Sequence, residues 1–251
     1  MTNEPQQTRQ THEAHQSPQA PQTRTAIFHM NMSEFWSGDL GLTLMTISLC
    51  ALVLVINPLR EAGIYGRVFF DVLVVTLMIS GALVVKQSRV ATALVVGFVV
   101  ASAVVLITGR LHPTPFFHQF GSILAAITLL LYVRIVLLVM FRGGQVTWSR
   151  IQGGVCVYLL LGMAWASAYQ FVEQRYPGSF VFASAPMDMD QMTAKLTYFS
   201  FGTLTTVGSD ISVLNPYARS LTIAEAIVGQ LFPAIFIGAL VAMAMQSRAK
   251  S

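Results

Sequence analysis

Charged residues are scarce in this chain of 251 residues. Asp, Glu, Lys and Arg make up 10% of it and hydrophobic residues 54%, whereas soluble domains average about 25% charged residues. One soluble core could not hide this much apolar surface, but a lipid bilayer can. The pI near 9.3 could suggest nucleic acid, yet the basic residues stand singly at the ends of apolar runs. The composition predicts an integral membrane protein with no nucleic-acid partner.

Cysteine and the short motifs of enzymes are also lacking. Cys50 and Cys156 lie inside separate apolar runs, which predicts reduced packing residues and neither a disulfide nor a metal pair. The sequence contains no Walker loop, no zinc-protease motif and no nucleophile elbow, the patterns that would suggest an enzyme. We therefore predict a protein that is not an enzyme and that uses no organic cofactor.

Long apolar runs are abundant, and six of them can cross the roughly 30 Å hydrocarbon core, which takes about 20 helical residues. They extend approximately over 40–56, 68–85, 90–107, 120–141, 151–171 and 221–245. A shorter segment at about 191–205 cannot cross and predicts a re-entrant helix. We expect an all-α membrane protein with six transmembrane helices, divided into a four-helix peripheral domain at 36–142 and a second domain at 143–251.

Both ends of the chain are polar. Residues 1–35 are rich in Gln and Pro without apolar periodicity, which predicts a disordered tail and no cleavable signal. A small excess of Lys and Arg beside the inward-facing ends of the six runs predicts cytoplasmic N- and C-termini. The few residues after 245 lead us to expect no ligand-binding domain behind the sixth run.

The most informative segment is 203–210, Thr-Leu-Thr-Thr-Val-Gly-Ser-Asp, which follows the short helix. Backbone carbonyls and a threonine hydroxyl, repeated around a four-fold axis, can replace the water shell of a potassium ion. The segment resembles the selectivity filter of the potassium channel superfamily, whose pattern is Thr-Val-Gly-Tyr-Gly-Asp. On either side, residues 177–180, 198–201, 216–221 and 225–231 look like the turret, pore helix and inner helix of bacterial six-helix members.

The resemblance implies a pore-forming subunit of a homotetramer in the bacterial inner membrane, which conducts K⁺ passively. The second domain would then be a pore domain of helix five, pore helix, filter and helix six. The family's innermost ion site would fall on Thr206, and the next sites on the carbonyls of Val207 and Gly208. Thr205, Ser209 and Asp210 would frame them, with Asp210 forming an acidic ring at the outer mouth. Asp188 and Asp190 are candidates to extend this ring, against the alternative of a solvated loop.

This chain departs from the family pattern at the centre of the filter. Thr206-Val207-Gly208 match it from the left and Asp210 from the right, but only Ser209 stands where the family has Tyr-Gly. The alternatives are therefore a weakly selective monovalent cation channel and a non-conducting regulatory or structural subunit. A secondary transporter is a further alternative, but the internal repeats typical of one are not found.

Residues around the filter carry further expectations. Tyr198, Phe199 and Phe201 are expected to brace it from behind. Glu225, near the outer end of the sixth run, is expected either to brace the pore helix or to be exposed at the interface.

The peripheral helices offer little for sensing. Arg134 and Arg142 are too few for the arginine ladder of a voltage sensor. The segment from His112 to His118 is expected to be an interfacial loop, against the alternative of a metal or pH-sensing site.

Overall fold

The computed structural model describes residues 40–62, 67–84, 89–111, 114–141, 147–184 and 188–248. The tail expected to be disordered, at 1–35, lies outside these residues. Within them the chain is almost entirely helical, and its two short strands, β1 (Phe180–Val181) and β2 (Ser212–Val213), pair antiparallel. The prediction of an all-α protein is therefore confirmed for the described part of the chain.

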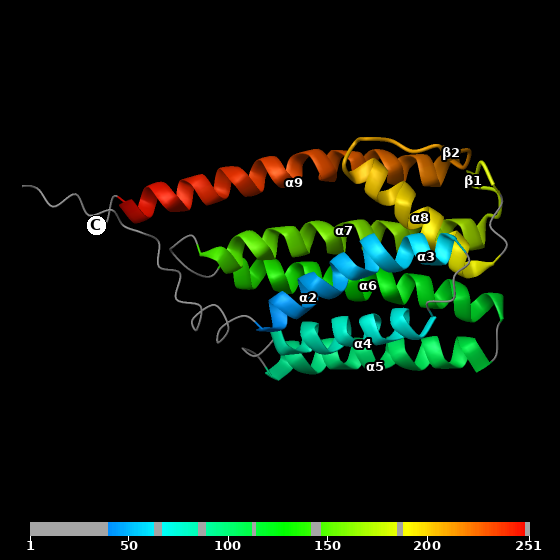
Figure 1. The fold of residues 1–251 in the computed structure, drawn as a ribbon, viewed down its shortest axis with the longest axis horizontal. Helices are drawn as coiled ribbons and strands as arrows, with labels where there is room; N and C mark the ends of the chain where they lie inside the picture. Colours follow the sequence, from blue (N-terminus) through cyan, green and yellow to red (C-terminus); the bar gives the residue numbers. More distant parts are fainter. Residues whose placement is uncertain are drawn as a thin grey trace, which may run out of the picture.

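The long helices run roughly parallel in one bundle, with α9 along one side and α4 and α5 along the opposite side (Figure 1). Their bounds are α2 (Leu40–Ala51), the π-helical turn η1 (Leu52–Ile56), α3 (Asn57–Glu61), α4 (Arg67–Val84), α5 (Arg89–Leu111), α6 (Pro115–Met140), α7 (Trp148–Arg175), α8 (Met189–Leu204) and α9 (Pro216–Arg248). The short α8 is inclined to the others and packs between α7 and α9.

Four helical segments are long and apolar enough to cross a membrane. They are Gly41–Glu61, Phe116–Met140, Trp148–Arg175 and Pro216–Gln246. Helices α4 and α5 carry shorter apolar stretches, Val72–Gly81 and Val96–Val105. These helices support an integral membrane protein, since a bilayer accepts helices that satisfy their own backbone hydrogen bonds.

The first helical segment is longer than the sequence predicts. The expected run ended at Ile56 before Pro58, but helical structure continues through η1 and α3 to Glu61. A proline inside an α-helix clashes with the carbonyl four residues earlier. The π-helical turn lies immediately before Pro58 and loosens the backbone where that clash would occur. Pro58 itself occupies the first turn of α3.

The expected loop between helices three and four is also shorter than predicted. Phe116, Phe117 and His118 lie in the first turns of α6, which begins at Pro115 with Thr114 as its N-cap. Proline is favoured at the first helical position, where its missing N–H has no partner to lose. His112 lies outside the described residues.

The largest apolar core joins α2, α4, α6 and α7. Met45, Leu49, Tyr132, Cys156 and Leu160 are buried in it. Both cysteines are free, and Cys156 packs inside this core as predicted. The helices of the expected peripheral and pore domains therefore share one core, so α7 is held on one side by α6 and α2.

Candidate ion-conducting segment

The N-terminal end of α8 is fixed by two aspartates. The Asp188 carboxylate caps the helix by accepting a hydrogen bond of 2.8 Å from the backbone N–H of Gln191. Asp190 pairs with Arg60 at the end of the first helical segment, with 2.6 Å between Oδ1 and Nη2. Both residues lie at the opposite end of α8 from residues 205–210. The suggestion that they extend an acidic ring at the filter is therefore wrong, because their carboxylates anchor the helix instead.

At its C-terminal end, α8 leads directly into the candidate filter, residues 205–210. Thr205 is the C-cap, and the next residues turn back, so that Gly208 N–H donates to the Gly202 carbonyl at 3.0 Å. Gly208 has φ +87° and Thr206 has φ +59°. Glycine adopts such angles at no steric cost, whereas a threonine there is strained. The positive φ of Gly208 is one that glycine allows, whereas the positive φ of Thr206 is a strain that the sequence does not indicate.

The candidate filter lies on the surface of the chain. Val207 is 84% exposed, Thr205, Thr206, Gly208 and Asp210 are also exposed, and Ser209 is half-buried. The Ser209 hydroxyl accepts a hydrogen bond of 3.3 Å from the Ile211 N–H. The negative end of the α8 dipole adjoins this segment and favours a cation beside it.

Helix α9 supports the filter through a contact that the sequence did not reveal. The Gln230 side-chain amide donates a hydrogen bond of 2.9 Å to the Thr206 hydroxyl. This contact holds the strained threonine in place and ties the filter to the last helix. The two residues lie 24 positions apart, so no local pattern could have paired them.

Helices α7 and α9 approach the end of α8 closely. The Tyr158 hydroxyl on α7 donates to the Leu204 carbonyl at 3.1 Å. On α9, a Cβ at Gly229 would collide with that same carbonyl. A Cβ at Gly202 would lie 2.5 Å from the Gly208 carbonyl oxygen. The glycines at 229 and 202 allow this close backbone contact with Leu204 and Gly208, and the contact fixes the position at which the candidate filter starts.

Glu225 is the buried polar centre behind α8. It is 0% exposed. Its two carboxyl oxygens are each 2.5 Å from a hydroxyl, that of Tyr169 on α7 and that of Ser200 on α8. Ser200 also lies 2.7 Å from the Gly162 carbonyl. Glu225 therefore braces the short helix α8, as expected, and the alternative of an exposed carboxylate is wrong.

The three aromatic residues expected to brace the filter lie on α8, and two of them pack against neighbouring elements. The Phe199 ring packs edge-on against Tyr169 and Phe180, with centroid distances of 5.0 and 5.3 Å. The Phe201 ring lies against Gly162, where a Cβ would come within 2.6 Å of it.

Tyr198 differs from the other two aromatics because it is 53% exposed. With Asp210 and Lys195 it lines a small cavity of about 260 Å³. Asp210 therefore lies on the surface of the protein, beside Tyr198.

The comparison with protein families points to transport. Residues 154–246 match the family model for an ion channel, and this stretch includes most of α7, α8, the candidate filter and most of α9. The match supports an ion channel. Neither the curated proteins nor the solved structures contain a match to this chain.

Proposed function

We propose that the chain is the pore-forming subunit of a tetrameric, potassium-channel-like cation channel. Four candidate filters would surround one axis, and the backbone carbonyls of Thr206, Val207 and Gly208 would replace the hydration shell of K⁺. Passage is passive, and the permeant ion is K⁺ or, with weaker selectivity, monovalent cations in general. No organic cofactor is involved.

The observation that carries this proposal is the exposure of the filter. Val207 is 84% exposed, and its neighbours present backbone polar groups at the depth of apolar helices. Irregular backbone at that depth is tolerated only where it is buried in protein or lines a water-filled path. This exposure supports a place for the segment away from lipid, beside further copies of the chain around a hydrated axis.

Helix α9 supplies the matching surface for assembly. Only 6% of its most apolar stretch is buried in the chain. Its exposed side chains recur every four residues at Ile223, Ile227, Leu231 and Ile235. This spacing places them along one face of the helix, a face that neighbouring subunits and lipid can cover.

The same arrangement favours cations over anions. The C-terminal end of α8 directs negative dipole charge toward the filter, and four copies would add at the axis. Asp210 contributes four carboxylates near the mouth and raises the local cation concentration. Discrimination between K⁺ and Na⁺ is expected to be weaker than with the full family pattern, because Ser209 replaces Tyr-Gly and one carbonyl per subunit is missing.

The proposed topology has six transmembrane helices with α4 and α5 among them. With both termini cytoplasmic, the end of the bundle that carries β1 and β2 faces outward. A bacterial inner membrane is the proposed location.

The test is ion flux through the full-length protein in liposomes, with mass measurement of the same sample in nanodiscs. We expect a tetramer that passes K⁺ down its gradient. A stable monomer or dimer would contradict the assembly. A folded tetramer that passes neither K⁺ nor Na⁺ would support the non-conducting regulatory subunit instead.

A further inference from the structure

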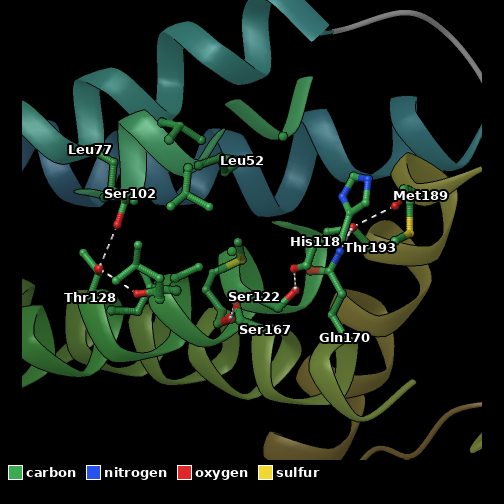
Figure 2. Close-up of a pocket in the computed structure, with 18 of the residues that line it drawn as sticks. Leu52, Leu77, Ser102, His118, Ser122, Thr128, Ser167, Gln170, Met189 and Thr193 are labelled. Carbon is green, nitrogen blue, oxygen red and sulfur yellow. Dashed lines mark hydrogen bonds between the residues drawn. The ribbon is translucent and has the colours of Figure 1, made fainter. Parts of the chain in front are cut away.

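A large cavity lies in the peripheral part of the bundle, separate from the filter. Its volume is about 610 Å³, which is within the range of small-molecule sites. It is enclosed by α4, α5 and the first helical segment on one side and by α6, α7 and α8 on the other (Figure 2).

The long walls of this cavity are effectively apolar. Leu52 and Leu77 face it from one side. The hydroxyls of the opposite wall are engaged by the helix backbone: Ser122 donates to the His118 carbonyl, Thr128 to the Leu124 carbonyl and Ser167 to the Met163 carbonyl, at 2.7–3.0 Å. Hydroxyls used in this way leave mostly carbon surface for an occupant.

Two side-chain amide groups that line the cavity have a nitrogen without an acceptor among the described residues. The side-chain nitrogens of Asn57 and Gln174 are buried and find no partner among the described residues. Asn57 is only 6% exposed. The Gln174 side-chain oxygen lies 3.2 Å from the Ser122 hydroxyl, and the side-chain nitrogen is the atom without a partner. An unsatisfied buried donor destabilises the fold, and an acceptor from a ligand would relieve this cost.

The charges on the cavity lining are already matched. Arg60 pairs with Asp190 at 2.6 Å, so the lining offers no net charge to an anionic or a cationic head group. Water alone fits poorly as well. At roughly 30 Å³ per molecule the cavity would need about 20 waters, most of them against carbon.

We propose that this cavity binds a neutral amphiphile, with an acyl chain along the apolar walls and with its ester carbonyl and a hydroxyl oxygen accepting from Asn57 and Gln174. Monoacylglycerol has this chemistry. The ligand would contact Met189 and Thr193 in the first turns of α8, the helix that leads into the filter. The inference concerns binding alone and holds whether or not the channel conducts.

Native mass spectrometry of the full-length protein in detergent tests the proposal, with monoolein as the probe. We expect saturable binding of one monoolein per chain. Oleate at pH 8 separates an anionic fatty acid from a neutral lipid, and dodecane separates head-group recognition from the filling of an apolar space. Both should bind at least tenfold more weakly. Equal binding of all three probes, or no saturable binding of monoolein, overturns the proposal.

Variants locate the site. Asn57→Leu and Gln174→Leu remove the donors and should weaken monoolein binding about tenfold each, while the melting temperature without lipid stays the same or rises, because an unsatisfied group is removed. Ala125→Phe fills the cavity and should abolish binding. Ile127→Phe is the matched control, since Ile127 is an exposed residue of the same helix. Binding that survives Ala125→Phe, or that falls equally with Ile127→Phe, overturns the assignment.

Discussion

At the scale of single residues, some features of the candidate filter could be predicted from the sequence and others could not. The left-handed angle of Gly208 and the bracing by Glu225 were both accessible, because glycine and a carboxylate in an apolar run each have few uses. The hydrogen bond from Gln230 to Thr206 could not be predicted, because it joins residues that are distant in the sequence. The strained angle of Thr206, the residue that accepts this hydrogen bond, was hidden as well.

Replacing Gln230 by Leu tests this tether. Without its hydrogen bond, Thr206 should relax from its strained angle, and K⁺ flux should fall roughly fivefold, the equivalent of about 1 kcal/mol for one hydrogen bond. Flux into liposomes per tetramer is the measurement. Ser220→Ala is the control, since the Ser220 hydroxyl on α9 donates within its own helix, to the Pro216 carbonyl. Unchanged flux in Gln230→Leu would show that the tether is dispensable.

Ser209 is the residue that should decide selectivity. Substituting Tyr-Gly for it restores the missing carbonyl and the family pattern, so the ratio of K⁺ to Na⁺ permeability should rise. Accounts of selectivity based on cavity size and on ligand number agree on this direction. Reversal potentials under bi-ionic conditions measure the ratio. A native channel that already excludes Na⁺, with no change on insertion, contradicts the interpretation of Ser209.

At the scale of elements, α8 was well predicted and the first helix was not. The expected short helix at 191–205 is observed as Met189–Leu204, because its apolar pattern and its end at the Thr-Thr pair are local signals. The first helix continues through Pro58 by means of a π-helical turn. A π-helical turn has no characteristic residue pattern. Pro58 was therefore the signal that could be seen in the sequence, and it indicated that the helix ends there.

The close contact between α9 and the end of α8 predicts an intolerant glycine. Gly229→Ala places a methyl group against the Leu204 carbonyl and should destabilise the fold by about 1–3 kcal/mol, the usual cost of overpacking. Gly238→Ala on the same helix is the control, since a Cβ there meets nothing within 4 Å. Melting temperatures in detergent compare the two. Equal melting temperatures would contradict the packing described for α8.

At the scale of the whole molecule, helices α2, α4 and α6 pack against α7, the first helix of the segment that matches an ion channel. The core formed by α2, α4, α6 and α7 is continuous. The sequence predicted two separate domains, at 36–142 and 143–251, because apolar runs do not show which helices pack together. Their junction and the cavity beside it could be seen only in three dimensions.

This architecture predicts little voltage dependence. Arg134 on α6 is exposed, and Arg142 lies outside the described residues, so the fourth helix shows no arginine ladder. Each elementary charge moved across the membrane supplies only about 2.3 kcal/mol per 100 mV. Planar-bilayer recordings should therefore give a shallow conductance–voltage curve. A steep curve that flattens in Arg134→Gln would contradict this.

The centre around Glu225 has a consequence for how the chain is made. Its two hydroxyl partners lie on α7 and α8, which the ribosome completes before α9 emerges. A carboxylate entering lipid alone is costly, whereas one arriving beside Tyr169 and Ser200 finds its hydrogen bonds ready. We therefore expect α9 to insert into the membrane at a lower free-energy cost once α7 and α8 are in place. The order of synthesis would then contribute to the positioning of the candidate filter.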